Sequence, residues 1–244
     1  MKAVILVAGF GSRLRPLTDN TPKSLLPIGN SNTLERMIRA LQERGVQEFI
    51  FVTGHFAEKI TGYVHEHFPE ITSHFVQNDK YEQTNTGYSL LLTESYVRGE
   101  TFVKFDGDVS FDSEILDRLF STPDDANYIC LDKAPIDNEV IKAQLASDGT
   151  VTALGKYVPV ENTAGESIGI EKIAAAFSAP LFDALTRIMT EEKNWQEYYE
   201  FAYDDLIKNG VVPFKYVDIT GLTWVEMDTP DDYKLAQQYF ASAE

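Results

Sequence analysis

Residues 2–23 constrain the fold of this chain more than any other segment. An apolar run at residues 3–7 (AVILV) has the length and composition of a buried strand, and Gly9 and Gly11 follow closely after it. Glycine lets the backbone approach an anion without an intervening Cβ, and successive free N–H groups in such a loop form an anion-binding concavity. Three basic residues follow in the same segment: Arg13, Arg15 and Lys23. We therefore expect a buried strand that ends in a loop suited to a polyanionic ligand.

The composition argues against several classes of partner and location. The 244 residues carry a formal net charge of −17, which would repel the backbone of a nucleic acid over most of the surface. No apolar run approaches the roughly 20 residues of a membrane span, and the start of the chain is too short and too interrupted by glycine for a signal peptide. The single cysteine, Cys130, lies in an apolar run and is expected in the core. We therefore expect a cytoplasmic protein that binds neither nucleic acid nor membranes.

The first 125 residues alternate between helical and strand patterns. Apolar side chains recur at helical spacing over residues 34–44, with Asn32 or Thr33 as the cap and Gly45 as the stop. The other elements expected in this half are strands at 49–52, 75–76 and 102–105 and helices at 56–67 and 85–96. This succession predicts a Rossmann-like α/β fold, in which helices cover both faces of a mixed, mostly parallel sheet.

The second half, residues 126–244, has a different character. Short strand-like segments separated by turn signals lie at 128–131, 140–145, 151–156 and 167–173. Helices at about 179–191 and 195–208, a strand near 213–218 and a helix from about Pro230 complete the chain. We expect this half to form a smaller β-rich layer on the first, within a single domain that spans residues 1–244.

Asp106, Gly107 and Asp108 directly follow the strand at 102–105. Ligands of open α/β sheets bind at the carboxyl ends of the strands, where the loop at residues 8–24 is also expected. The two segments should therefore face each other across a cleft. Carboxylates in this position suit Mg²⁺, which takes one or two protein carboxylates besides water and phosphate oxygens. Asp108 is the main candidate ligand, while Asp106 either supports it or is a solvated acid.

A second acidic cluster occupies residues 224–232. In a strand, Glu226 and Asp228 point to the same side, as a shared metal ion requires. The residues that follow, TPDD, have the pattern of a helix cap, a proline at the first helical position and an acidic first turn. We therefore expect those last two acids to complement the helix dipole.

A glycine loop, Arg13, Lys23 and a carboxylate-bound metal together suit chemistry at an electrophilic phosphorus atom. Cations and metal neutralise the phosphate oxygens, position the nucleophile in line and stabilise charge on the leaving group, so no protein nucleophile is needed. The Gly-Lys-Ser/Thr pattern of a P-loop is missing from the sequence, which disfavours ordinary γ-phosphoryl transfer.

Residues 8–18 (AGFGSRLRPLT), followed by Pro22 and Lys23, closely resemble the signature of the sugar-phosphate nucleotidyltransferases, also called pyrophosphorylases. The resemblance continues through Asp108 to residues 224–228 and so spans nearly the whole chain. It implies the nucleotide-diphospho-sugar transferase fold, with residues 1–125 as the nucleotide-binding half and residues 126–244 as the acceptor-binding half.

This family joins a nucleoside triphosphate to a phosphorylated acceptor and releases pyrophosphate. The resemblance implies that Arg13 and Lys23 are catalytic and hold the phosphates, and that Asp108 binds Mg²⁺. Many sugar-specific members have W-x-D-x-G where this chain has WVEMD. The second metal ligand is therefore Glu226, Asp228 or both.

Further segments resemble the phosphocholine cytidylyltransferase-like branch, which includes enzymes for phosphocholine and aminoethylphosphonate and points to CTP. These segments are residues 77–81, 85–90, 166–170 and 197–200, together with the pair Glu226 and Asp228. The residues implied to contact the nucleotide are Leu6, Ala8, Gly9, Gly11, Ser12, Gln77, Asn85, Thr86, Ser89 and Gly107. Those implied to contact the acceptor are Lys142, Lys156, Glu166, Trp195, Tyr198, Tyr199 and Glu200.

Each assignment in the acceptor set has a structural alternative. Aromatic faces and carboxylates attract ammonium, so the segment at 195–200 would suit a cationic head group. The same tyrosines could instead pack on an amphipathic helix. Lys142 and Lys156 either contact phosphate or are solvated strand residues, and Glu166 either contacts the acceptor or only begins a strand.

The leading hypothesis is a Mg²⁺-dependent cytidylyltransferase that acts on a small phosphorylated acceptor. A second hypothesis keeps the reaction but uses a hexose 1-phosphate with UTP, GTP or dTTP. A third, from a different class, is a non-catalytic regulatory relative that senses nucleotides, which the presence of Arg13, Lys23 and Asp108 disfavours. A homodimer is compatible with the sequence, although no feature establishes one.

Overall fold

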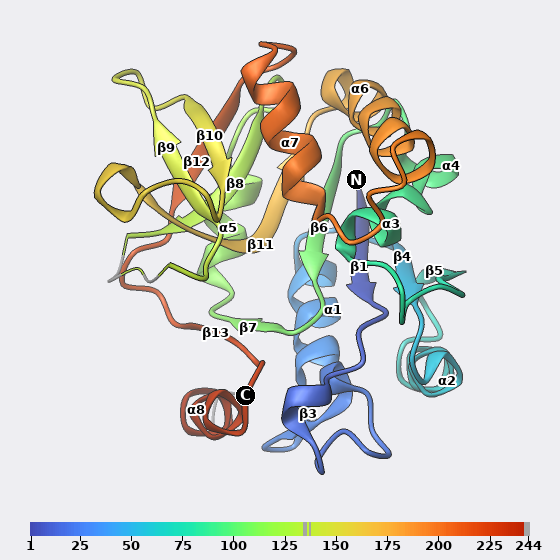
Figure 1. Ribbon diagram of the computed structural model, residues 1–244. Coiled ribbons are helices and arrows are strands. Elements are labelled where there is room, and N and C mark those ends of the chain that lie inside the picture. Colours follow the sequence, from blue (N-terminus) through green and yellow to red (C-terminus); the bar gives the residue numbers. More distant parts are fainter. Residues whose placement is uncertain (134–135, 137, 242–244) are drawn as a thin grey trace.

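The computed structural model describes residues 1–133, 136 and 138–241, and nine strands of this part form one mixed sheet (Figure 1). The strand order is β10-β9-β11-β6-β1-β4-β5, with β8 paired to β11 and β12 paired to β8. The nine strands are β1 (Lys2–Val7), β4 (Glu48–Thr53), β5 (Thr72–Gln77), β6 (Phe102–Asp106), β8 (Asn127–Asp132), β9 (Lys142–Leu145), β10 (Val151–Gly155), β11 (Gly165–Ile173) and β12 (Phe214–Asp218).

The strands of the first half, β1, β4, β5 and β6, run parallel to one another, as the alternating sequence pattern predicts. Ile5 lies opposite Phe51 on β4 and Phe105 on β6, and all three side chains are fully buried. The helices of this half are α1 (Thr33–Glu43), α2 (Ala57–His67), α3 (Thr86–Leu91), α4 (Glu94–Val97) and α5 (Glu114–Phe120). The Asn32 side chain caps α1, as expected, because its Oδ1 accepts the Glu35 N–H at 2.8 Å.

The helix expected over residues 85–96 is divided into α3 and α4. Thr93 is fully buried between them, and its hydroxyl donates to the Leu90 carbonyl at 2.7 Å. A threonine side chain that bonds the preceding turn competes with the helical backbone pattern, which explains the interruption.

The strands of the second half extend the same sheet instead of stacking on it. β11 runs antiparallel to both β6 and β8, and it therefore connects the parallel half to the β-rich half. The second half also supplies α6 (Ala175–Thr186), α7 (Tyr199–Lys208), a π-helical turn (Arg187–Glu191) and a 3-10 turn (Val160–Asn162). The expectation of a smaller β-rich region is confirmed, with the difference that hydrogen bonds make it continuous with the central sheet.

Helices cover both faces of the sheet, as predicted (Figure 1). Apolar side chains of α1, α2 and α5 pack in one core cluster, which also contains the buried Cys130. Side chains of α3, α6 and α7 pack in a second cluster against the opposite face. None of the helices in the described part is long and apolar enough to span a membrane.

A small ribbon and the last helix lie outside this sheet. β7 (Val109–Phe111) pairs antiparallel with β13 (Trp224–Glu226), and α8 (Pro230–Phe240) follows. A minor core beneath α8 includes Ile28, which belongs to β2 (Pro27–Ile28), the partner of the short strand β3 (Ser31–Asn32). Thr229 and Asp232 form a reciprocal capping box at the start of α8, which confirms the cap predicted for the TPDD segment.

Candidate active site

The glycine loop leaves the carboxyl end of β1 in a fixed conformation. Gly11 has φ +60°, where side chains are strained, and a Cβ there would lie 3.1 Å from Thr18 Cγ2. The Thr18 hydroxyl donates to the Gly11 carbonyl at 2.7 Å, and the Ala8 carbonyl accepts the His55 N–H at 3.2 Å. Gly9 and Ser12 remain exposed. Two 3-10 turns, Ser12–Leu14 and Lys23–Leu25, continue the segment and carry Arg13 and Lys23.

The turn after β6 faces this loop, as expected from the positions of the strands. The Gly107 N–H donates to the Leu6 carbonyl at 3.0 Å. A Cβ at position 107 would lie 2.3 Å from Val7 Cγ1 and 2.7 Å from the Leu6 oxygen, so only glycine fits without displacing β1. This close approach fixes Asp108 beside the glycine loop.

Arg13 and Lys23 both reach acids that are remote in the sequence. Lys23 Nζ lies 2.5 Å from Asp108 Oδ2 and 2.8 Å from Asp228 Oδ1, and Arg13 Nη2 lies 2.5 Å from Asp228 Oδ2. Burial alone would lower the pKa of the Lys23 ammonium, but the two carboxylates outweigh burial and raise that pKa. Burial likewise favours a higher pKa for Asp228, but Lys23 and Arg13 hold that pKa below its usual value.

Asp108, Glu226 and Asp228 form a cluster, here called the acid triad. One carboxylate oxygen from each residue lies within 4.8 Å of the other two. The β7–β13 ribbon produces this arrangement, because Glu226 pairs with Val109 and the Met227 N–H donates to the Asp108 carbonyl at 3.0 Å. Desolvation by the surrounding protein atoms raises the pKa of the Glu226 carboxyl to about 8, although the residue is exposed by surface area, and repulsion from Asp108 and Asp228 adds to this shift.

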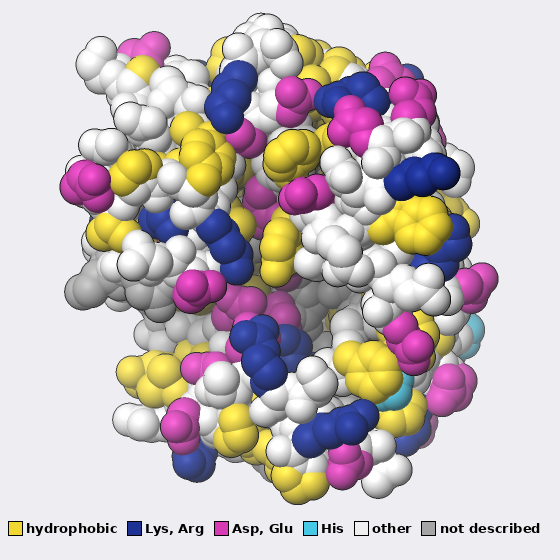
Figure 2. Space-filling model, viewed as in Figure 1, with side chains coloured by type: hydrophobic (Ala, Val, Ile, Leu, Met, Phe, Trp, Pro, Cys, Tyr) yellow, Lys and Arg dark blue, Asp and Glu magenta, His cyan; other side chains and the backbone are white. Residues whose placement is uncertain are grey.

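The acid triad has the donor set of a hard divalent cation. All three residues offer carboxylate oxygens, which Mg²⁺ prefers to nitrogen or sulfur. Asp108 Oδ1 is buried and has no hydrogen-bond partner among the described residues. An unpartnered buried oxygen is costly unless a ligand engages it, so these residues fit a metal ion. On the face of the molecule shown in Figure 2, acidic and basic side chains gather around a central hollow.

The residues expected near the base and ribose lie at the ends of β5 and α3. Gln77 is exposed, and its Oε1 accepts from the Thr53 hydroxyl at 3.3 Å. Asn85 caps α3 through the Thr86 N–H at 2.8 Å, which occupies its side-chain oxygen. Ser89 is buried and accepts a hydrogen bond from Asn78 at 3.1 Å. The Thr86 hydroxyl is buried and has no partner among the described atoms.

Several residues of the expected acceptor set face different environments. Lys142 is buried, and its Nζ donates to the carbonyls of Asn138 and Val140 at 2.9 and 3.2 Å. Lys156 is exposed and has its Nζ 5.3 Å from the centroid of the exposed Tyr198 ring. Glu166 is half-buried on β11.

The segment at 195–198 is not the first turn of a helix. The Trp195 carbonyl accepts the Asn85 N–H at 2.9 Å, and the Glu197 carbonyl accepts the Gly87 N–H at 3.3 Å. These bonds bind the segment to the start of α3, so that α7 begins only at Tyr199. The sequence pattern predicts that this helix begins at about residue 195, which is four residues too early.

Tyr199 and Glu200 are buried, and Tyr199 contacts Lys104, a residue that the sequence did not single out. The Tyr199 hydroxyl donates to Asp106 Oδ2 at 2.7 Å, and its ring lies over the ammonium of Lys104. The sequence contains a signal for this buried lysine, because Lys104 interrupts the apolar strand FVKF. A lysine at one position of a strand usually faces solvent, however, so the signal does not by itself indicate burial.

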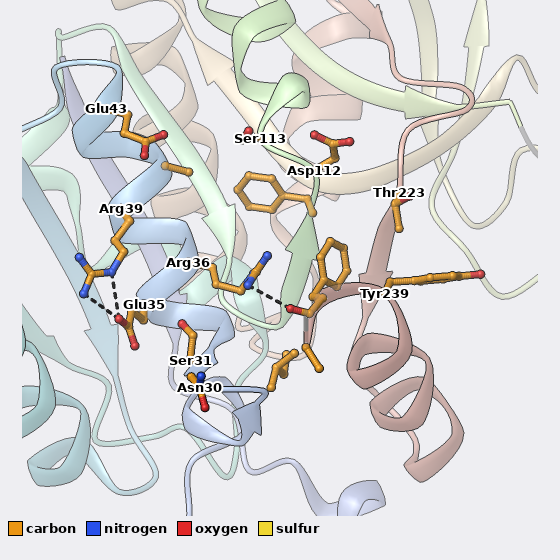
Figure 3. A pocket seen from close by; sticks show the side chains of 15 residues that line it. Asn30, Ser31, Glu35, Arg36, Arg39, Glu43, Asp112, Ser113, Thr223 and Tyr239 are labelled. Carbon is orange, nitrogen blue, oxygen red and sulfur yellow. Dashed lines mark hydrogen bonds and ion pairs between the residues drawn. The ribbon is translucent and has the colours of Figure 1, made fainter. Parts of the chain in front are cut away.

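A separate pocket of about 890 Å³ lies between α1, β7 and α8 (Figure 3). Two arginines line it, but Arg39 is paired with Glu35 at 2.8 Å and Arg36 donates to the Phe240 carbonyl at 3.2 Å. None of the residues predicted for the site lines this pocket. The predicted site residues instead lie around the glycine loop and the acid triad, at the ends of β5 and α3, on or next to the strands β9 to β11, and at the start of α7.

Comparison with known proteins decides the family. A family model described as a MobA-like NTP transferase domain matches residues 3–196. The chain belongs to this family. Relatives of this NTP transferase domain include nucleotidyltransferases, which confirms the family suggested by the glycine loop.

Two relatives and one solved structure illustrate the similarity. The NTP transferase domain is 28% identical over 251 residues to the CMP-5'-(3-aminopropyl)phosphonate synthase of Streptomyces rubellomurinus, in a match that covers 99% of this chain and 39% of that protein. It is 26% identical over 240 residues to the choline-phosphate cytidylyltransferase of Streptococcus pneumoniae, covering 98% and 97% of the two chains. The inositol-1-phosphate CTP transferase from T. maritima has a TM-score of 0.79 at 21% identity, covering 97% and 93%, and shows the shared fold.

Proposed function

We propose that this protein is a Mg²⁺-dependent nucleotidyltransferase. It transfers the nucleotidyl group of CTP to a small phosphorylated acceptor and releases pyrophosphate. One observation carries the proposal: Arg13 and Lys23 converge with the acid triad beside the glycine loop. Cations that can neutralise a triphosphate and carboxylates that can hold a metal ion thus lie in one cleft.

The proposed reaction is a displacement at the α-phosphorus of the nucleotide. An oxygen of the acceptor phosphate forms the new bond to the α-phosphorus. The bond from the α-phosphorus to the bridging oxygen breaks, and its electron pair leaves with pyrophosphate. The acceptor oxygen is already ionised near neutral pH, so the step needs no base from the protein.

The chain's own residues supply binding and charge for this step. Arg13 and Lys23 neutralise phosphate oxygens, and the free N–H groups around Gly9 and Gly11 bind them. Asp108, Glu226 and Asp228 would hold Mg²⁺, which supplies charge neutralisation on the phosphates when bound. Before substrate binds, Lys23 and Arg13 compensate the acid triad, so the same cations stabilise the site in both states.

Substrate contacts complete the proposal. We place the nucleotide against Leu6, Gly107 and the β5–α3 edge with Gln77, Asn85, Thr86 and Ser89. We place the acceptor toward Lys142, Lys156 and Glu166, and toward Trp195 and Tyr198, whose segment is hydrogen-bonded to the start of α3. The names of the relatives favour CTP, since one makes a CMP conjugate and another is a cytidylyltransferase. The proposed substrates are metabolites of the cytoplasm, where we place the protein.

Pyrophosphate release tests the proposal directly. The full chain with Mg²⁺ is assayed with CTP, UTP, GTP and dTTP against phosphocholine, 2-aminoethylphosphonate, inositol 1-phosphate, glycerol 3-phosphate and glucose 1-phosphate. We expect release with CTP and a small acceptor, and a loss of release with EDTA. Release only with glucose 1-phosphate and another nucleotide would establish the sugar-nucleotide alternative. Binding of nucleotide without release for any pair would favour the regulatory alternative.

A further inference from the structure

A buried lysine lies behind the acid triad, surrounded by acids and an aromatic ring. Lys104 on β6 has no exposed surface, and its Nζ lies 2.9 Å from Glu171 Oε2 on β11 and 3.1 Å from Asp106 Oδ1. The same atom lies 3.5 Å from the centroid of the Tyr199 ring. Together with Glu200, which is also buried, these residues are called the Lys104 cage.

The cage has the chemistry that recognises an ammonium ion. An aromatic face attracts a cation through its quadrupole, and nearby carboxylates supply the opposite charge. A further contact comes from the Gly169 carbonyl, which accepts from Lys104 Nζ at 3.3 Å. The ammonium in this cage is therefore one that the chain itself provides.

The cage is joined to the candidate active site through Asp106, whose side chain is 24% exposed. Asp106 accepts from Lys104 through Oδ1 and from the Tyr199 hydroxyl through Oδ2, and the turn to Asp108 follows directly. Gly169 has φ +74°, and a Cβ there would lie 2.2 Å from Asp106 Oδ2. The backbone of β11 is thus shaped to admit the Asp106 carboxylate next to the acid triad.

The protonation of the cage acids supports the view that the cage is already filled. Burial raises the pKa of Glu171 to about 8 and that of Glu200 to about 7, although Lys104 opposes both shifts. Both carboxyls therefore take up a proton more readily than an exposed glutamate, so the cage holds less negative charge than three fully ionised acids would. A second cation would find little uncompensated charge there.

The other aromatic rings of the acceptor side are also adjacent to lysines of the chain. Lys80 Nζ lies 4.4 Å from the centroid of the Trp195 ring, and Lys156 Nζ lies 5.3 Å from that of Tyr198. Each ring expected to attract a cationic head group therefore already has an ammonium beside it.

We propose that Lys104 is a built-in cation that occupies the ammonium cage of this site, so that the acceptor is a phosphate or phosphonate whose remote end carries hydroxyl or carboxylate groups and no ammonium. This inference rests on the proposed function and narrows its acceptor class.

A matched set of acceptors tests the inference on the unaltered protein. 2-Hydroxyethyl phosphate, 2-carboxyethyl phosphate, 2-aminoethyl phosphate and phosphocholine differ at the remote end, and each is assayed with CTP and Mg²⁺. We expect kcat/KM for the hydroxyl or carboxylate compound to exceed that for both ammonium compounds by about 10-fold, the scale of one desolvated cation–π contact. Turnover with the opposite preference would overturn this inference and leave the proposed function intact. No pyrophosphate release in this set or in the acceptor panel above would overturn the proposed function and the inference together.

Substitution of the built-in cation sharpens the test. In Lys104→Met we expect the ratio of kcat/KM for 2-aminoethyl phosphate to that for 2-hydroxyethyl phosphate to rise about 10-fold, because the cage then lacks its cation. Lys104→Arg keeps the charge and should keep the wild-type ratio. Lys133→Met removes a lysine from the face of Tyr216, a ring outside the proposed acceptor set, and serves as the matched control. An equal change of the ratio in Lys133→Met and Lys104→Met would contradict the assignment. If Lys104→Met does not fold, as judged by circular dichroism, the wild-type panel and Lys104→Arg decide.

Discussion

The acid triad and the Lys104 cage are two neighbouring groups of acids around a lysine, but they differ in burial. Lys23, which is paired with the triad, keeps 15% of its side chain exposed, and Asp228 keeps 25% exposed. Lys104 and Glu171 keep at most 1%. In the triad the ion pairs can be exchanged for substrate and metal, whereas in the cage any exchange would leave a charge without solvent. The same chemistry therefore serves binding in one place and permanent structure in the other.

The largest effect should come from the triad residue with the unpartnered oxygen. We expect Asp108→Asn to lower pyrophosphate release by a factor on the order of 10³, because metal and phosphate charge are no longer compensated at the transition state. Asp231→Asn, at the exposed start of α8, is the control and should leave release unchanged. Undiminished release in Asp108→Asn would remove the metal role assigned to this residue.

Loss of the cage lysine should reduce stability more than loss of the lysine beside the acid triad, which is the reverse of their expected effects on activity. We expect Lys104→Met to lower the free energy of unfolding by about 3–5 kcal/mol, because it leaves buried acids without their cation. Lys23→Met should cost less, about 2 kcal/mol, since the side chains of Lys23 and Asp228 are only partly buried, although it should abolish activity. Urea denaturation of both variants measures the difference. Equal losses of stability would show that the two groups do not differ in the way their burial indicates.

Gly169 tests how tightly the cage is built. We expect Gly169→Ala to cost about 3 kcal/mol, from the strain of a positive φ together with the contact with Asp106. Gly221 has φ +86° with no atom within 4 Å of an added Cβ, so Gly221→Ala isolates the strain. That control should cost about 1 kcal/mol. Identical losses in thermal denaturation would mean that the cage yields to the added methyl group.

The pH dependence of stability should give the most gradual effect, because it is spread over the interval between two pKa values. Glu171 has a pKa of about 8 in the folded protein against an ordinary value of 4.5, so folding favours its protonated form. Its contribution is complete below pH 4.5 and is lost as the pH rises to about 8. Glu171→Gln should therefore flatten the decline of the melting temperature over this range, measured in EDTA.

Glu226 has a similar pKa, so Glu226→Gln should also flatten the decline in EDTA. With excess Mg²⁺ only Glu171→Gln should retain its effect, and a loss of both effects would contradict the separation of cage and triad.

Much of this architecture follows from local sequence patterns. The strand at residues 3–7, the glycine loop and the Asp106–Asp108 turn were predictable together, because carboxyl ends of parallel strands share one edge of a sheet. The cap at Asn32 and the capping box before α8 follow from side-chain chemistry within one turn.

Features that depend on distant partners were not predictable. The contact of Lys23 with Asp228 spans 205 positions, and nothing local to either residue specifies it. The burial of Tyr199 follows from hydrogen bonds of the 195–198 segment to the start of α3, which delay α7 and direct the tyrosine inward. Lys104 could be placed in the interior only once acids from β11 and α7 were known to surround it.

The β7–β13 ribbon makes the candidate site a late product of synthesis. Glu226 and Asp228 are joined to Asp108 by this ribbon, so two members of the triad are not yet made when the central parallel strands are complete. A nascent chain that has folded those strands can display the glycine loop but not the full set of carboxylates. The capacity to hold a metal ion should therefore arise abruptly, when residue 228 has emerged from the ribosome and closed the ribbon.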